Sequence, residues 1–272
     1  MRVLMVSTGS RGDVQPLLAL ALALRSRGHD VHVAAPPDFQ AWVGELGLPF
    51  TPWGGHVEAA LNRHAGYMGA HPARVLCAAM ANVARETPGW IERTVRAARG
   101  FDTIVSTPHY AARSVAERLE VPWISVVYTP TLLRSAYHPP LPSRRQGSPR
   151  WMNALAWKAF DALTHRALAP GINAIRDSWG LPALDSVPRH LEGLPILLAC
   201  DPVVSPAPPD WAPLRVTTTG PLFYEDDAPL DPAVEAFLDA GPPPVFVGFG
   251  SAPARDAAGL TRAVVSGAGR RA

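Results

Sequence analysis

Cysteine is scarce in this chain, and long apolar runs are absent. Two cysteines in 272 residues, Cys77 and Cys200, exclude a disulfide framework and any C-x-x-C motif. The longest apolar run, residues 17–24, falls far short of the roughly 20 residues that span a bilayer. Arg11 and Asp13 follow the first apolar run too closely for a secretory signal. We therefore expect a cytoplasmic protein without a targeting or transmembrane segment.

An excess of one charge is also lacking. The 25 basic and 23 acidic side chains leave a net charge of +2, which gives too weak a field to hold a nucleic acid backbone. Lys158 is the one lysine, so basic charge is nearly all guanidinium, which binds carboxylate or phosphate as a planar fork. The nine histidines form no H-E-x-x-H motif and no zinc-spaced cluster. We expect no nucleic acid, no metal ion and no resident cofactor.

Strand-like and helix-like segments alternate through the first 220 residues. Hydrophobic residues make up 47% of the chain, and its 30 prolines and 22 glycines lie mostly between apolar segments, as in a globular protein with many defined loops. The expected strands are 3–7, 31–35, 103–106, 123–128, 195–200 and 215–219. The expected helices are 16–27, 38–46, 72–99, 110–119 and 151–179, the last with a break at Pro170 and Gly171. This alternation predicts an α/β fold with a doubly wound parallel sheet.

The composition changes after residue 220. An acidic cluster, scattered prolines and one short apolar helix around Phe237 are typical of an interdomain linker. After the linker we expect a buried strand at 245–249 and then a helix whose residues 260–265 face a core. A single strand-helix unit cannot bury both of its faces. We therefore predict a domain at 1–220, a linker at 221–244, and at 245–272 the truncated start of a second Rossmann-like domain that exposes apolar surface.

The loop of residues 8–16 joins the first strand to the first helix. Ligands bind at this edge of open α/β sheets, and the free amides of a helix N-terminus favour an anion such as phosphate. Gly9 and Gly12 are expected to let the backbone turn sharply. Asp13 is then a carboxylate at the mouth of a cleft, or else a side chain that only caps the helix. The loop lacks the lysine of a P-loop and the third glycine of the dinucleotide fingerprint.

A second strand-and-glycine segment, residues 242–251, ends in Gly250 and Ser251. It misses the dinucleotide fingerprint, and Ser251 does not stand in a G-x-S-x-G nucleophile elbow. The functional interpretation is another ligand-contacting turn. The alternative is a strand end with a serine helix cap.

Two further features are candidates for an apolar cleft. His109 follows the expected strand at 103–106 and is a candidate for the cleft lining, although a solvated or core histidine is the commoner case. A stripe of large apolar side chains is typical of helix core, with an acceptor wall or a membrane-facing surface as alternatives: Trp151, Trp157, Phe160 and Leu163.

Four segments carry a resemblance: Gly-Ser-Arg-Gly-Asp-Val-Gln-Pro at 9–16, Gly-His-Asp-Val at 28–31, Thr-Gly-Pro at 219–221 and Pro-Val-Phe-Val-Gly-Phe-Gly-Ser at 244–251. Together they resemble the GT-B glycosyltransferases, within these the family 28 and family 1-like group that glycosylates sterols, glycopeptide aglycones and polyketides. The resemblance runs from residue 1 to about 266. It implies two facing Rossmann-like domains, the first binding mainly the acceptor substrate and the second mainly a nucleotide sugar.

The resemblance also implies roles for single residues. Asp13 matches the catalytic base, Ser10 a loop residue near the donor phosphates, and Ser251 a phosphate contact. The remaining substrate-binding residues expected from the two loops and the cleft are Arg11, Gly12, His109 and Gly250. The implied reaction is an inverting transfer of a hexose from a nucleotide-diphosphate sugar to a hydroxyl of an apolar sterol, lipid, polyketide or glycopeptide acceptor. Peripheral membrane contact stays open.

The donor side of the resemblance is incomplete. In the family the donor site also uses a His/Gly-rich loop and a later acidic-Gln pair, whereas the last histidine here is His190. We therefore expect the donor-binding half to be largely missing and the activity of this chain to be impaired. A non-catalytic acceptor-binding fragment is the second hypothesis, and an unrelated α/β nucleotide-binding protein is the third.

Overall fold

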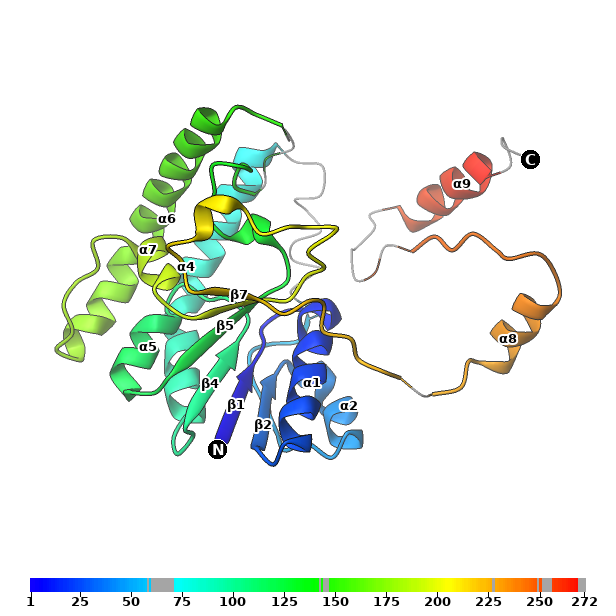
Figure 1. Ribbon diagram of the computed structural model, residues 1–272, viewed down its shortest axis with the longest axis horizontal. Coiled ribbons are helices and arrows are strands. Elements are labelled where there is room, and N and C mark those ends of the chain that lie inside the picture. Colours follow the sequence, from blue (N-terminus) through cyan, green and yellow to red (C-terminus); the bar gives the residue numbers. More distant parts are fainter. Residues whose placement is uncertain are drawn as a thin grey trace.

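The computed structural model describes residues 1–57, 59, 71–141, 143, 147–226, 228–248, 250 and 256–268. One sheet of seven strands has the order β3-β2-β1-β4-β5-β6-β7, and each neighbouring pair is parallel (Figure 1). The strands are β1 (Arg2–Val6), β2 (Asp30–Ala35), β3 (Phe50–Pro52), β4 (Thr103–Ser106), β5 (Trp123–Val127), β6 (Ile196–Leu198) and β7 (Val216–Thr218). The predicted doubly wound α/β fold is confirmed.

Helices connect the strands and then continue into the C-terminal part. The α-helices are α1 (Arg11–Ser26), α2 (Gln40–Glu45), α4 (Pro72–Ala97), α5 (Ala112–Leu119), α6 (Arg150–Ser178), α7 (Val187–Glu192), α8 (Pro232–Asp239) and α9 (Ala257–Ala268). Three short 3-10 helices are η1 (Pro37–Phe39), η3 (Pro130–Leu132) and η4 (Pro209–Trp211). Because the strands are parallel and joined by helical crossovers, helices cover both faces of the sheet.

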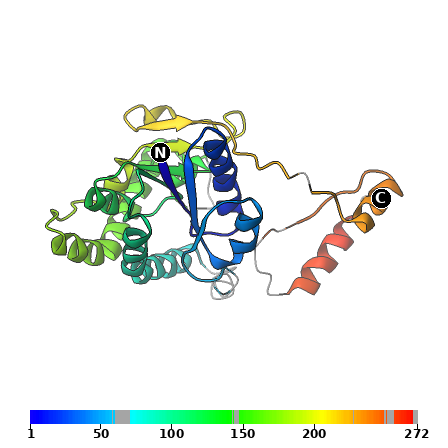
Figure 2. The same cartoon turned by 90° about the horizontal axis from the view of Figure 1, so that it is seen from below.

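Each face of the sheet has its own core, because alternate side chains of a strand point to opposite faces. In β1, Val3 and Met5 pack against α1 and α2, whereas Leu4 and Val6 belong to the core beneath α4, α5 and α6. Figure 2 shows α1 and α4 on opposite sides of the sheet. The side chains on both faces of β1 are therefore buried, as the continuous apolar sequence of this strand predicts.

In the sheet, β1 lies between β2 and β4, and the direction in which successive strands are added reverses there. The chain leaves β1 for α1 on one face and later leaves β4 for α5 on the other. The loops after β1 and β4 therefore open a crevice at the carboxyl edge of the sheet, which is where ligands bind in folds of this class.

Two helices differ from the sequence prediction. Helix α1 begins at Arg11, a turn before the expected start, because Ser10 and Asp13 form a capping box ahead of Pro16. Helix α6 runs unbroken through Pro170 and Gly171. The expected break there is wrong, since packing of α6 on α4 and α7 outweighs the single backbone hydrogen bond that a proline removes. Strand β3 and helix α7 were not predicted at all.

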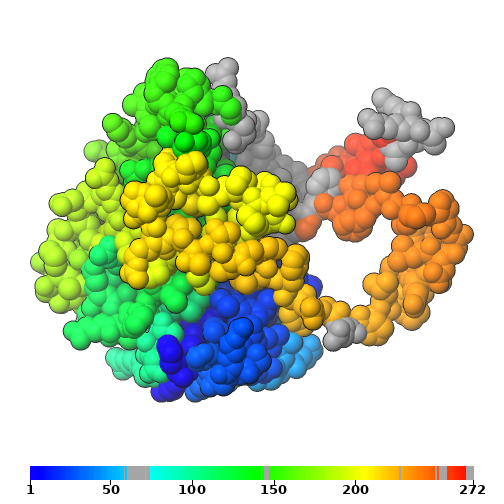
Figure 3. Space-filling view, viewed as in Figure 1, coloured from blue at the N-terminus to red at the C-terminus, as the bar shows by residue number. Residues whose placement is uncertain are grey.

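The chain after Tyr224 forms an arm that stands away from the sheet (Figures 1 and 3). None of the described residues beyond Tyr224 is buried, and Val245 and Phe246 are 90% and 91% exposed. The expected buried strand at 245–249 is wrong for residues 245–248, and Phe249 lies outside the described residues. A single strand without a partner leaves its backbone groups unpaired, so it does not form. The expected helix is present as α9, and the exposed apolar surface is confirmed.

Candidate functional site

The loop between β1 and α1 lies on the crevice at the carboxyl edge of the sheet. Its first part is tied to the neighbouring strand, since Ser7 N donates to the Ala34 carbonyl over 3.0 Å. Ser10 is the N-cap of α1 and has an extended backbone, with φ −75° and ψ −174°. Gly12 and Asp13 then lie in the first turn of the helix, where Asp13 N donates to the Ser10 carbonyl oxygen over 2.9 Å. The geometry places Ser10, Gly12 and Asp13 together, as predicted.

The Asp13 carboxylate is held against this loop. Its Oδ2 accepts hydrogen bonds from the Ser10 backbone N over 2.9 Å and from the Ser10 hydroxyl over 3.4 Å. Among the described residues, no hydrogen bond ends at Oδ1. Asp13 therefore caps the helix, as the structural alternative predicted, and still has one carboxylate oxygen that can accept a proton.

The two loop glycines differ in what the structure requires of them. Neither Gly9 nor Gly12 has a positive φ, and the backbone bends at Gly9, as predicted. A Cβ on Gly9 would lie 1.9 Å from Oδ2 of Asp13, so this glycine is needed for the close approach of the carboxylate. A Cβ on Gly12 would meet only the Ser10 hydroxyl, at 4.0 Å. Nothing within the described protein requires glycine at position 12.

Tyr128, which the sequence analysis did not single out, fixes the backbone of Asp13. It follows the end of β5, and its hydroxyl donates to the Asp13 carbonyl oxygen over 2.9 Å. Burial, and then the negative charge of Asp13, raise the pKa of Tyr128. The phenol is therefore a neutral donor, and it ties the first turn of α1 to the centre of the sheet.

Arg11 turns toward α2. Its guanidinium carbon lies 4.8 Å from the centre of the Trp42 ring, and its Nε donates to Gln15 over 3.0 Å. Trp42 also contacts Tyr224 edge to face, with ring centroids 5.3 Å apart. The start of the arm and the predicted substrate-binding Arg11 therefore meet on one aromatic ring.

His109 lies after β4 and lines a cavity of about 250 Å³. Its ring stacks on Trp90 with centroids 3.7 Å apart and an angle of 3° between planes. Burial lowers the pKa of His109 to about 3, so the ring is neutral at ordinary pH. Its Nδ1 accepts from the Ala111 backbone N over 3.2 Å, which places the proton on Nε2. The expected cleft-lining position is consistent with this geometry.

The aromatic cavity, as we name this space, is built from the carboxyl ends of several strands and from one face of α4. Its lining includes Thr8 after β1, Trp53 after β3, His109 after β4, and Trp90 and Arg93 of α4. Thr8 directly precedes Gly9, on which the Asp13 carboxylate packs. The cavity therefore reaches the loop that holds Asp13. Sequence reasoning missed the tryptophans and Arg93 because they are far apart in the chain.

Of the other predicted positions that the structure describes, Gly250 is not brought to this site. Gly250 is exposed in the arm with φ +57°, a turn conformation that favours glycine, and Ser251 lies outside the described residues. The apolar stripe on α6 is divided, because Trp157 is buried in the protein whereas Trp151 is 69% exposed. Those side chains therefore do not form one face.

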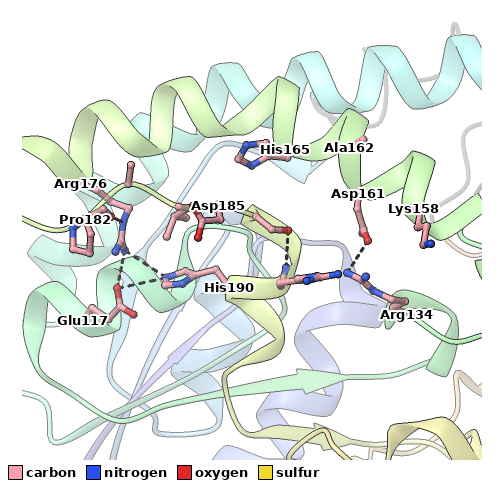
Figure 4. Close-up of a pocket in the computed structure, with 14 residues that line it drawn as sticks. Glu117, Arg134, Lys158, Asp161, Ala162, His165, Arg176, Pro182, Asp185 and His190 are labelled. Atoms are coloured by element: carbon pink, nitrogen blue, oxygen red, sulfur yellow. Dashed lines mark hydrogen bonds and ion pairs between the residues drawn. The ribbon is translucent and has the colours of Figure 1, made fainter.

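A larger cavity of about 730 Å³ lies between α5, α6 and α7 (Figure 4). Its charged side chains pair with one another: Arg176 Nη1 lies 2.7 Å from Glu117 Oε2, and Arg134 Nη2 lies 2.6 Å from an Asp161 oxygen. Burial, and then the nearby arginines, lower the pKa of His190 to about 4 against the pull of Glu117. The Arg176–Glu117 pair joins α6 to α5, and the cavity lining includes none of the loop residues 7–13.

Among the described residues, no helix is both long and apolar enough to cross a membrane. Within the same ranges no group of three or more His, Cys, Asp and Glu side chains is arranged to hold a metal ion.

Comparison with known proteins matches residues 3–137 to the glycosyltransferase family 28 N-terminal domain. The whole chain is similar to vancomycin aglycone glucosyltransferase of Amycolatopsis orientalis (35% identity) and to glycosyltransferase GtfE of the same organism (37%), and it spans 66% of the length of each. Among solved structures, the glycosyltransferase SsfS6 of Streptomyces sp. SF2575 has the same fold, with a TM-score of 0.54 and 20% identity over 84% of this chain and 56% of that one. Residues 3–137 of this chain therefore form a glycosyltransferase family 28 N-terminal domain.

Proposed function

We propose that this chain forms the acceptor-binding part of an inverting hexosyltransferase, acting from a nucleotide-diphosphate sugar on a hydroxyl of an apolar acceptor. The observation that carries the proposal is the Asp13 carboxylate, held by Ser10 at the carboxyl edge of the sheet beside the aromatic cavity. The family 28 domain and the printed names of the relatives support the same reaction class. The chain spans 66% of the length of each of these two relatives, so the transfer activity is proposed here for the longer protein.

In the proposed mechanism Asp13 is the general base. One of its oxygens is engaged by Ser10, and Oδ1 takes the proton from the acceptor hydroxyl as the hydroxyl oxygen attacks the anomeric carbon. The new bond forms as the bond from that carbon to the diphosphate breaks, so the configuration inverts and the nucleoside diphosphate leaves. Proton removal by a positioned base typically contributes about 10² to 10⁴ in rate.

The start of α1 suits the leaving diphosphate. Backbone N–H groups at a helix N-terminus and the Ser10 hydroxyl can stabilise negative charge without a metal ion. Gly12 leaves space there for a ligand oxygen to approach the backbone. We propose that Gly250 and Ser251 contact the donor, that Arg11 helps to position the loop, and that His109 lines the acceptor side. We place the reaction in the cytoplasm, in keeping with the two unpaired cysteines.

The domain division remains part of the proposal. Residues 1–220 would bind the acceptor, 221–244 would link, and residues from 245 onward would contribute to donor binding. The burial pattern supports this division, because none of the described residues after Tyr224 is buried.

The test is transfer by a chimera in which this chain continues into the C-terminal part of vancomycin aglycone glucosyltransferase. Incubation with a nucleotide-activated glucose and a panel of hydroxylated apolar acceptors should yield products heavier by one hexose. NMR of a product should show the inverted anomeric configuration. A retained configuration would reject the mechanism, and no product with any acceptor would reject the reaction class.

Acceptor binding without transfer is the second candidate. It is favoured by one observation, namely that the described residues of the arm build no buried surface opposite Asp13. Calorimetry on the 272-residue chain separates the two, because tight binding of a nucleotide sugar to this chain alone would contradict the binding-only function.

A further inference from the structure

Large apolar and basic side chains are exposed together at the start of α6. Trp151 is 69% exposed, Leu155 is 60% exposed, and Lys158 is exposed as well. Because these residues stand at i, i+4 and i+7, they lie on one face of the helix. We name this surface the α6 patch and define it by six exposed residues: Tyr137, Arg150, Trp151, Met152, Leu155 and Lys158.

The buried side of α6 fixes how the patch is presented. Trp157 is 4% exposed, and its Nε1 donates to the His138 carbonyl oxygen over 2.9 Å, which fastens the preceding segment to the helix. Tyr137 is the neighbouring residue in that segment, and the guanidinium carbon of Arg150 lies 4.1 Å from the centre of its ring. The aromatic ring, the cation and the exposed helix face therefore belong to one surface.

Acidic residues are missing from this part of the sequence. Residues 121–160 contain four arginines and the one lysine of the chain, but neither aspartate nor glutamate. Within the described ranges, neither Arg150 nor Lys158 forms an ion pair. Both cations of the α6 patch are thus free to meet an anionic partner.

The carboxylates that come near from other parts of the chain are already engaged. Asp161 pairs with Arg134 over 2.6 Å, and its side chain is only 13% exposed. Asp210 accepts a hydrogen bond from the Ser135 hydroxyl over 2.8 Å. These contacts leave the positive charge of the α6 patch uncompensated.

This combination of side chains matches the surface of a lipid bilayer. Tryptophan and tyrosine are enriched at the level of the lipid headgroups, and helices that lie on membranes carry basic residues beside an apolar face. A second copy of this chain fits less well, because two such patches would bring like charges together. A protein partner usually anchors in a pocket, and Tyr137, Trp151 and Leu155 line neither of the two cavities described above.

We propose that the α6 patch binds the surface of a bilayer that contains anionic lipids. Trp151 and Leu155 insert at the level of the headgroups, and Arg150 and Lys158 contact the lipid phosphates. The start of α6 lies beyond the carboxyl edge of the sheet (Figure 1), so the bilayer meets the protein on the same side as the crevice. This binding goes beyond the proposed transfer reaction and needs no sugar donor.

The test is co-sedimentation of the 272-residue chain with vesicles of equal parts phosphatidylcholine and phosphatidylglycerol, and with vesicles of phosphatidylcholine alone. The mixed vesicles should bind at least about tenfold more tightly, since each of the two cations near an anionic surface contributes about fivefold. Added salt should weaken this binding, because ions screen the attraction. Equal binding to both kinds of vesicle, or binding to neither, would overturn the proposal.

Two pairs of exposed residues supply matched variants. Trp151→Ser should weaken binding at least about tenfold through lost apolar burial. Phe237→Ser, which removes a ring that is 66% exposed on α8 of the arm, should leave binding unchanged. Lys158→Gln should weaken binding about fivefold, whereas Arg118→Gln on α5 should not. Equal losses within either pair would show that the α6 patch is not the binding surface.

Two further measurements test other occupants of the patch. A parent chain that is dimeric in size-exclusion chromatography, with a monomeric Trp151→Ser variant, would assign the patch to an interface between copies. A chimera that no longer binds the mixed vesicles would show that the C-terminal part covers the patch. Either result would overturn the proposal. Sugar transfer by the chimera is a separate measurement, so its failure would reject the proposed function and leave the vesicle results standing.

Discussion

At the scale of single residues, Asp13 caps α1, and we propose that it is also the catalytic base. Its carboxylate completes the capping box with Ser10, and its second oxygen is available for chemistry. Measurements of stability on two variants test the capping role. Asp13→Asn should leave the melting temperature nearly unchanged, because an amide oxygen can also accept from the Ser10 N–H. Asp13→Ala should lower the free energy of unfolding by about 1 kcal/mol. Equal destabilisation by both variants would show that the negative charge itself stabilises the helix.

His109 makes stability depend on pH. Burial lowers its pKa in the folded protein from 6.5 to about 3. Between these values the unfolded chain binds a proton that the folded chain does not, so stability falls as pH decreases below about 6.5. One such group contributes a slope of at most about 1.4 kcal/mol per pH unit.

Denaturant unfolding at pH 7, 6 and 5 tests this dependence. The slope should be shallower in His109→Phe, which keeps a ring against Trp90 without a titrating nitrogen. An unchanged slope would contradict the assignment of a neutral, buried His109.

The site residues could be predicted from the sequence where they are neighbours in the chain or, like His109, directly follow a predicted strand. Ser10, Gly12 and Asp13 follow one strand, so a single loop motif identifies them. Trp53 and Trp90 are brought together by α4 crossing the carboxyl ends of the strands. No local pattern marks either tryptophan, because each is equally typical of an ordinary core.

At the scale of elements, the loop between β1 and α1 depends on Gly9. Gly9→Ala should displace the Asp13 carboxylate, since the added Cβ would lie 1.9 Å from its oxygen. Gly12→Ala has open space and should leave folding intact or slightly improve it, because alanine favours helix over glycine. Thermal melting of the two variants checks this difference. A Gly12→Ala variant that melts well below Gly9→Ala would contradict the geometry.

The elements that the sequence predicted well are those with strong local patterns. Strand β4 was predicted with its exact bounds from four buried residues, and Gly28 ends α1 with φ +83° as a C-cap glycine should. Strand β3 was not predicted because three residues are too few to show the alternation of apolar and polar residues that marks a strand. The break expected in α6 failed because tertiary packing, which no local pattern reports, keeps the helix continuous.

At the scale of the whole molecule, the arm and the sheet domain should differ in their protection from proteolysis. Every described residue after Tyr224 is at least partly exposed, whereas the central strands β1, β4 and β5 are buried on both faces. Limited proteolysis should therefore cut first between residues 225 and 256 and leave a resistant fragment of about residues 1–222. Mass spectrometry of the fragments identifies the sites. First cuts within the strands, or an arm that resists cleavage, would contradict the domain division.

We propose that the sheet domain binds the acceptor and that Asp13 removes its proton. The most direct measurement compares kcat and acceptor binding for the chimera with Asp13 and for its Asp13→Asn variant. We predict a fall in kcat of about 10² or more, with acceptor affinity and melting temperature nearly unchanged, because the amide keeps the loop but cannot take the proton. A kcat retained within a few-fold would contradict the claim and leave Asp13 as a helix cap.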